Sequence, residues 1–408
     1  MTTPIGSSVG ADVPRIAIYT PEYAADPHRV YREMRSRYGS FAPVELAPGV
    51  PATLVIGYRE AVRILHDPEH FPADPRVWEQ SIPDSCPVKP MMRWYPGVAR
   101  NAGALHARYR QANVAAIDGV DLYGRQAAVE KTATRLINTF CEVGEADLLS
   151  QYAFPLVFAG LNEMLGCPPA LGERVATGMA HLFNAIDDKA DLGMKMLSEA
   201  LLEVVALKRA EPGDDMVTRF VQHPADLSEE EILVNVISMY GAALEPQQNL
   251  IVNTLLLILT DDRFGGDVLG GSLSTRDAID EVLFTDPPVS NYATSYPRQP
   301  ILIGDTWLPA HQPVVISLAA CNDDPVLSDG EFLGNRSHLA WSLGSHACPA
   351  KPLASLIAQE AIDQLLDALP EMRLAVRADK LTWRPGPFHR ALAALPVVFP
   401  KSPPLNVP

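Results

Sequence analysis

A long apolar run near the middle of the chain most constrains the fold. It extends from Ile232 to Leu259 and follows Ser228 and Glu231, whose spacing is that of a capping box, with acidic residues crowding the first turn. The run is interrupted by polar or helix-breaking residues, namely Asn235, Glu245, Pro246, Gln247, Gln248, Asn249 and Asn253. A membrane span tolerates few such groups. We therefore expect one long helix buried inside a large soluble protein, and no transmembrane segment.

Helical patterns dominate the chain from about residue 104 to 285, whereas strand-like pieces are short and far apart. Further helices are expected at 27–38, 59–68 and 352–370, and strands at 52–58, within 299–320 and at 393–400. No GxGxxG follows a strand and no Walker loop occurs, which disfavours nucleotide-binding folds. The pattern predicts a mainly α fold with small β-sheets.

The bulk composition excludes several classes of partner. The chain has 408 residues, 47% of them hydrophobic, and a formal net charge of −16. The acidic balance argues against nucleic-acid binding and against docking to anionic lipid. The N-terminus MTTPIGSSVGADVPR lacks the basic start and apolar core of a signal peptide. The five cysteines are odd in number and scattered, so we expect reduced thiols in a cytoplasmic protein.

One cysteine lies in a glycine-bearing loop just before the last long helix. In HLAWSLGSHACPAKPLA, residues 338–354, Cys348 follows Gly344 by four residues and His346 by two. A thiolate at a helix N-terminus is stabilised by the helix dipole and by free backbone N–H groups, which makes it a good iron ligand. Two alternatives remain open here: an inert buried cysteine, and a zinc site, for which only His346 is close in sequence.

This loop resembles the haem-binding signature of the cytochrome P450 family. Trp341 stands for the usual phenylalanine, Gly344, His346 and Cys348 match in order, and Ala350 replaces a glycine. Alanine suits that position if its φ is not positive. The resemblance implies haem b (iron protoporphyrin IX) as cofactor, with Cys348 as the metal ligand.

Other segments resemble the family in the same order along most of the chain. They are 52–71, 211–223 followed by 227–240, 286–289, 308–325 and 338–341. HARYR, residues 106–110, resembles the motif in which His106 and Arg110 bind a haem propionate; the alternative is a solvated helix face. The resemblance implies a single P450 domain over 1–408. Its β-containing part covers about 1–100 and 290–320 and its helical part about 101–285 and 339–370, with the long central helix over the haem.

The long helix departs from the family pattern at its proton-relay residues. The usual acid is present as Glu245, but the alcohol position holds Pro246, which has neither hydroxyl nor N–H and predicts a kink. Water, a substrate hydroxyl, Gln247 or Gln248 are the candidates to complete the relay, and we assign Glu245 and Gln247 as catalytic. The alternative for Glu245 is a carboxylate that faces solvent or caps freed backbone groups.

The Glu-x-x-Arg pair of the family is also altered. In AIDEVLFTDPPV, residues 278–289, Glu281 is present but Phe284 occupies the arginine position, as in an atypical bacterial subgroup that this chain resembles. An unpaired buried carboxylate costs on the order of 3–5 kcal/mol, so another cation should meet Glu281. Arg336 is the candidate, and the segment from Pro325 to His338 is shorter than the family's loop.

Two further departures concern the cofactor and its electron donor. The strand arginine that binds a propionate in the family falls near Ser295, so Arg298 is the candidate replacement. Ser355 replaces a basic residue after Leu353-Ala354, which thins the positive patch that meets a ferredoxin, although Lys351 remains.

The resemblance implies a haem-thiolate monooxygenase for an unknown hydrophobic small molecule, with electrons from a separate ferredoxin and its reductase. The substrate would lie near Met91, Met92, Trp94, the long helix and residues 291–296. One alternative is a haem protein whose monooxygenase activity is atypical or lost, acting as a sensor, a peroxide-using enzyme or a regulatory partner. Another is an interaction protein that binds no haem.

Overall fold

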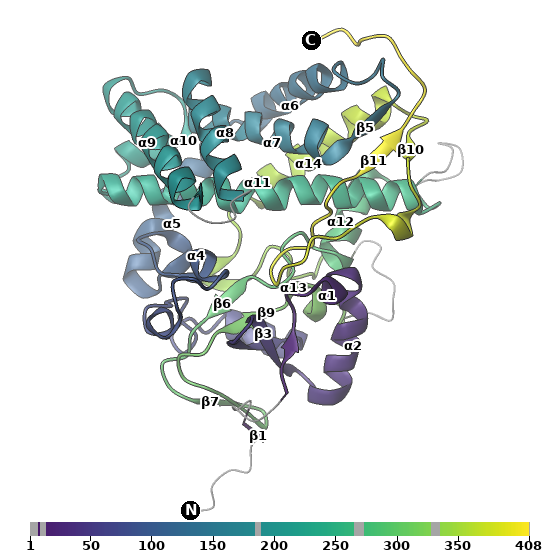
Figure 1. Cartoon of the computed structure of the whole chain (residues 1–408). Coiled ribbons are helices and arrows are strands. Elements are labelled where there is room, and N and C mark those ends of the chain that lie inside the picture. Colours follow the sequence, from purple (N-terminus) through teal and green to yellow (C-terminus); the bar gives the residue numbers. More distant parts are fainter. Residues whose placement is uncertain (1–6, 9–13, 184–188, 265–272, 328–334, 408) are drawn as a thin grey trace, which may run out of the picture.

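The computed structural model describes residues 7–8, 14–183, 189–264, 273–327 and 335–407 (Figure 1). The helices are α1 (Pro21–Ala25), α2 (Pro27–Tyr38), α3 (Tyr58–Leu65), α4 (Lys89–Met92), α5 (Gly103–Asp118), α6 (Leu122–Ile137), α7 (Phe154–Leu165), α8 (Pro169–Phe183), α9 (Lys189–Ala210), α10 (Met216–Gln222), α11 (Glu229–Thr260), α12 (Thr275–Thr285), α13 (Leu318–Asn322) and α14 (Lys351–Ala368). The strands are β1 (Ser7–Ser8), β2 (Ile16–Ala17), β3 (Phe41–Ala47), β4 (Val50–Val55), β5 (Glu145–Asp147), β6 (Ala293–Ser295), β7 (Ile301–Ile303), β8 (Thr306–Leu308), β9 (Val314–Ile316), β10 (Arg373–Leu374) and β11 (Pro396–Val398).

Helix α11 crosses the middle of the molecule, with a helical layer on one side and the larger sheet on the other (Figure 1). Its start is fixed by the expected capping box: the Glu231 N–H donates to Ser228 Oγ at 3.2 Å, and the Ser228 N–H donates to Glu231 Oε2 at 2.8 Å. The helix continues as one element across Pro246. The prediction of a single long helix is confirmed.

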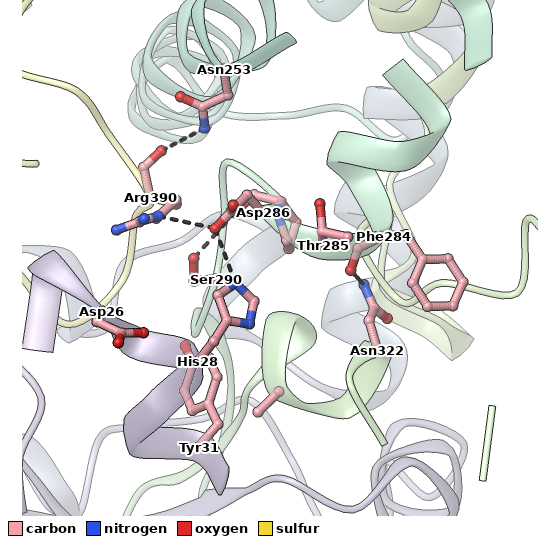
Figure 2. Close-up of polar contacts among 12 residues, drawn as sticks. Asp26, His28, Tyr31, Asn253, Phe284, Thr285, Asp286, Ser290, Asn322 and Arg390 are labelled. Atoms are coloured by element: carbon pink, nitrogen blue, oxygen red, sulfur yellow. Dashed lines mark hydrogen bonds and ion pairs between the residues drawn. The ribbon is translucent and has the colours of Figure 1, made fainter. Parts of the chain in front are cut away.

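Two of the polar side chains that interrupt the apolar run of α11 bond to other elements of the fold. Asn113 of α5 donates to Asn235 Oδ1 at 2.8 Å, and Asn253 donates to the backbone carbonyl of Arg390 at 3.0 Å (Figure 2). In the part of the chain that the structure describes, no helix has the length and apolar character needed to cross a membrane. The polar interruptions of the apolar run are therefore contacts inside a folded protein.

The larger sheet joins two distant parts of the chain. Its strand order is β2-β3-β4-β9-β6, with β4 parallel to β9 and β9 antiparallel to β6. Two further three-stranded sheets have the orders β1-β8-β7 and β10-β11-β5. Strand β9 pairs with both β4 and β6, so β6 lies in the same sheet as strands from the first hundred residues.

A mainly α fold with small β-sheets is thus confirmed. The predicted helix at 27–38 is α2, whose Asp26 cap accepts from the Arg29 N–H at 3.0 Å. The strand expected at 52–58 is shorter, because α3 begins at Tyr58. The predicted shortening of the loop between Pro325 and His338 lies partly outside the described residues.

Candidate functional site

The cysteine loop is held against the end of α3 by a glycine that no other residue could replace without strain. Gly344 has φ +68°, and a Cβ atom there would lie 2.1 Å from the Leu65 carbonyl oxygen. The Cys348 N–H donates to the Trp341 carbonyl at 2.8 Å and closes the loop. The structure therefore fixes the path of the backbone that carries Cys348 to the start of α14.

The substitution Ala350 fits this loop. Its φ is −91°, outside the left-handed region that favours glycine, so an alanine is accommodated. Burial raises the pKa of the Cys348 thiol, while the Ala350 backbone N–H and the charges of Arg110 and Lys351 act in the opposite direction. The Ala350 N–H, Arg110 and Lys351 therefore favour the thiolate form of Cys348, against the effect of burial.

The zinc alternative finds no support in the described part of the chain, where no group of three or more His, Cys, Asp or Glu side chains could hold a metal ion. All five cysteines are free thiols. From Trp341 to Ala350 each residue keeps accessible surface, although Leu339 and Leu353 on either side are buried. The loop that carries Cys348 therefore offers a single thiol and an uncovered backbone.

The structure brings three of the predicted cofactor-binding residues together. His106 and Arg110 lie one turn apart on α5, and the His106 ring lies 4.2 Å from that of His346 in the cysteine loop. His106 is 6% exposed, and its Nε2 is buried without a hydrogen-bond partner. Burial lowers the pKa of both His106 and Arg110. These groups form a basic cluster in which His106 is buried and Arg110 and His346 are partly buried.

Burial, and then nearby positive charges, lower the pKa of His346 to about 3. Those charges belong to His106, Arg100 and Arg110. Within the described ranges, none of these four side chains forms an ion pair. The arginines of this set supply positive charge and the imidazoles supply N–H donors, among them the unpartnered His106 Nε2, so the cluster fits carboxylates such as a pair of propionates.

Arg298 does not join this cluster. Its side chain is exposed, and its charge acts on Asp74 instead. The chain turns away from β6 at Pro297, which carries Arg298 outward. The residue that sequence reasoning missed is Arg100, which is 3% exposed and reaches β6 from the short helical turn Val98–Arg100. Nothing local in the sequence distinguishes Arg100 from a surface arginine.

The two residues assigned to proton transfer lie in different surroundings. Glu245 forms an ion pair with Arg384 from the C-terminal segment, which agrees with neither a solvent-facing carboxylate nor a backbone cap. Gln247 is buried and donates from Nε2 to the Ala354 carbonyl of α14 at 3.0 Å. Gln248 Oε1 is buried without a partner. Gln247 is thus engaged in the contact between α11 and α14, which does not support a relay role for it.

The prediction that Arg336 pairs with Glu281 was wrong. Arg336 donates to Asp280 at 2.7 Å, whereas Glu281 Oε1 lies 2.6 Å from Arg263 Nη2. Successive residues on a helix point about 100° apart, so Asp280 faces the segment at Arg336 while Glu281 faces the residues just after α11. Glu281 is therefore paired, but by a cation 18 positions earlier in the chain.

Phe284 is buried, at 1% exposed, with its ring 6.2 Å from that of His338 in an edge-to-face contact. Asn322 of α13 donates to the carbonyls of Leu283 and Phe284 at 3.1 and 3.0 Å (Figure 2). Its Oδ1 accepts from the Leu339 N–H at 2.7 Å. An amide thereby links the end of α12 to the segment that leads into the cysteine loop.

Comparisons with known proteins agree on one family. The chain is 27% identical to cytochrome P450 107B1 of Saccharopolyspora erythraea over 95% of this chain and 98% of that protein. It is 27% identical to cytochrome P450 monooxygenase PikC of Streptomyces venezuelae, over 96% and 95%. No family model matches the chain.

Solved structures give the same result. CYP154C4 from Streptomyces sp. W2061 superposes with a TM-score of 0.84 at 26% identity, covering 94% of this chain and 98% of that chain. The structure named "Testerone bound CYP154C4" from Streptomyces sp. ATCC 11861 gives a TM-score of 0.85 at 26% identity, over 95% of this chain and 98% of that chain. The likeness therefore extends over the whole domain.

Proposed function

The chain belongs to the cytochrome P450 family of haem-binding oxidoreductases, and we propose that it is a monooxygenase acting on a bulky hydrophobic small molecule with electrons from a separate ferredoxin and reductase. The observation that carries this proposal is the closed loop that brings Cys348 to the start of α14, held by Gly344 against Leu65 and in contact with His106 of α5 through His346.

In this proposal Cys348 holds the iron, Gly344 fixes the loop, and His106, Arg110 and His346 hold the propionates. Haem bound through a thiolate supplies the activation of oxygen. The Arg110 guanidinium would balance the charge of the carboxylates, and the imidazoles of His106 and His346 would donate N–H groups to them.

Proton delivery is assigned to Glu245. Its carboxylate is engaged by Arg384, so it can bond to a relay water only after Arg384 moves away. Pro246 contributes no hydroxyl and leaves the Ala242 carbonyl without its helical N–H donor. A water at that carbonyl and at the unpartnered Gln248 Oε1 would complete the path.

The substrate class is inferred from the segments expected to line the site and from the relatives. Tyr292 donates to the Met91 carbonyl at 2.5 Å, which joins two of the segments expected beside the substrate. Met92 is buried in the core and Asn291 is bonded to Tyr23 and Pro387, so neither is free to contact a substrate. Relatives are named as hydroxylases of 6-deoxyerythronolide B and of a naphthoate, and we propose a hydrophobic ring compound here.

A second candidate is a haem protein that no longer carries out monooxygenation. It is favoured by Pro246 in the alcohol position together with the Glu245–Arg384 ion pair, because both reduce the groups available for proton transfer.

Two measurements test the proposal. Reduced protein under carbon monoxide should give the red-shifted Soret band of a thiolate-bound haem, and Cys348→Ala should remove that band. Oxygen consumption with a surrogate ferredoxin and reductase should rise on adding a compound that perturbs the haem spectrum. A thiolate band without such a rise would favour the second candidate, and protein without haem would contradict both.

A further inference from the structure

Arg100 is a buried cation with no carboxylate beside it. It closes the short turn Val98–Arg100 just before α5 and is 3% exposed. In the described part of the chain its hydrogen-bond partners are all neutral. A buried guanidinium that lacks a counter-charge is unfavourable unless a ligand supplies one.

The contacts of Arg100 orient it but leave one donor unused. Its Nη1 donates to Thr294 Oγ1 at 2.9 Å. Its Nη2 lies 2.6 Å from the Met91 carbonyl and 2.6 Å from the Tyr292 hydroxyl. Its Nε is buried without a hydrogen-bond partner. A guanidinium held by three neutral oxygens, with a free N–H, is prepared to receive an anion.

The position of Arg100 relates it to the basic cluster around the cysteine loop. It ends the turn Val98–Arg100, which leads directly into α5, the helix that carries His106 and Arg110. Its partner Thr294 lies on β6 beside Ser295, the position at which the strand arginine of the family is absent. Arg100 therefore brings a guanidinium to β6 from a different segment.

We propose that Arg100 binds a haem propionate and takes the place of the missing strand arginine, as a positioning residue for the cofactor. The unpartnered Nε2 of His106 lies in the same cluster, so two buried polar atoms there lack partners. A substrate carboxylate is the other source of the same chemistry. The propionate accounts better for both atoms, because His106 contacts the cysteine loop through His346.

Haem loss from the holoprotein tests the proposal, which rests on haem binding at Cys348. The rate of haem transfer to excess apomyoglobin is measured for wild type, Arg100→Gln, Arg100→Lys and the matched control Arg298→Gln. Loss of a charge-assisted hydrogen bond should make transfer from Arg100→Gln about tenfold or more faster, with Arg100→Lys intermediate. Arg298→Gln should match wild type. Equal rates for Arg100→Gln and Arg298→Gln would overturn the proposal.

A purely structural role for Arg100 is separated by a modified cofactor. Proteins loaded with haem dimethyl ester have no propionate charge, so Arg100→Gln should accelerate transfer of the ester little beyond wild type. Acceleration as large for the ester as for haem would overturn the proposal. The propionate-bending bands in the resonance Raman spectrum of the holoprotein should shift in Arg100→Gln and stay unchanged in Arg298→Gln.

The remaining outcomes are distinguishable. If wild type lacks haem or the thiolate band, the proposed function fails along with this inference. If wild type is normal, and Arg100→Gln keeps the wild-type rate but loses the spectral response to dodecanoate and not to dodecanol, Arg100 serves a substrate carboxylate and only this inference is overturned.

Discussion

The Nη2 atom of Arg263 lies 2.6 Å from Glu281 Oε1, and this contact ties the residues after α11 to the middle of α12. It supplies the cation that Phe284 cannot. Arg263 also pairs with Asp261 at 2.6 Å. Both carboxylates accept from the same Nη2 atom of Arg263. Because that arginine is half exposed, the ion partner of Glu281 lies at the surface rather than in the interior.

Arg263→Gln should therefore lower the free energy of unfolding by about 1 kcal/mol, because the arginine is half exposed while Glu281 is largely covered. Arg336→Gln should cost less, since Arg276 remains near Asp280. Urea denaturation of both variants, with Glu281→Gln for a double-mutant cycle, gives the coupling energy. A coupling energy near zero between Arg263 and Glu281 would contradict the pairing of these two side chains.

Phe284→Arg should not restore a family-like pair. The position is 1% exposed and its ring packs edge-to-face against that of His338, so an arginine there would bury a charge in a space shaped for an aromatic ring. Glu281 is already paired with Arg263. We expect a loss on the order of 3–5 kcal/mol, against a smaller loss for the control Phe284→Leu. A rise in thermal midpoint together with better haem retention would argue against adapted surroundings.

Local signals predicted local structure well. Ser228 caps α11 through Glu231, three positions later, as the spacing indicates. The ion partners were not predictable in this way. Glu245 meets Arg384 from 139 positions away, because the pairing depends on how the C-terminal segment packs against α11.

The cofactor site shows the same division. Motif spacing predicted that His106, Arg110 and His346 belong to one site, and the structure brings them together. Arg298 was chosen for its nearness in sequence to Ser295, but the strand ends before it and its side chain is exposed. Arg100 contacts Thr294 from 194 positions away, and burial without an anion is visible only in three dimensions.

Gly344→Ala should disrupt the cysteine loop. The added Cβ would meet the Leu65 carbonyl at 2.1 Å, and φ is positive, so we expect a loss of about 2–3 kcal/mol and a diminished thiolate band. Gly241→Ala on α11 is the control: its Cβ meets nothing within 4 Å, and alanine favours the helix by up to about 1 kcal/mol. Carbon monoxide spectra and thermal midpoints measure both. An unperturbed Gly344→Ala protein would show that the loop can relocate.

The network around Asp286 predicts a pH-dependent contribution to stability (Figure 2). Asp286 accepts from Arg390 at 3.0 Å and lies 3.3 Å from His28 Nε2. Burial opposes ionisation of Asp286, but His28 and Arg390 outweigh it and lower the pKa to about 2. Burial also opposes protonation of His28, yet the hydrogen bond with Asp286 prevails and raises its pKa.

The directions of the two pKa shifts define the pH ranges in which Asp286 and His28 stabilise the folded protein. The contribution of Asp286 is present above the ordinary aspartate pKa and is lost as pH falls through about 2. That of His28 is complete below the ordinary histidine pKa and is lost as pH rises through its raised pKa. His28→Gln should therefore destabilise the protein more at pH 6 than at pH 9, as measured by urea midpoints. His70→Gln, at the exposed pair with Asp67, should change the midpoint less. A difference between wild type and His28→Gln that does not vary with pH would show that His28 contributes only packing.

The variants Glu245→Gln and Gln247→Leu test which of the two side chains delivers protons. Removing the titratable group should lower the product formed per oxygen consumed by about tenfold or more, while the carbon monoxide band is retained. Gln247→Leu loses its hydrogen bond to the Ala354 carbonyl, so it should lower stability by about 1 kcal/mol and leave coupling near wild type. Both are assayed with a surrogate ferredoxin and reductase and a compound that perturbs the haem spectrum. If Gln247→Leu uncouples turnover and Glu245→Gln does not, proton delivery runs through the amide, and the Glu245–Arg384 ion pair is structural.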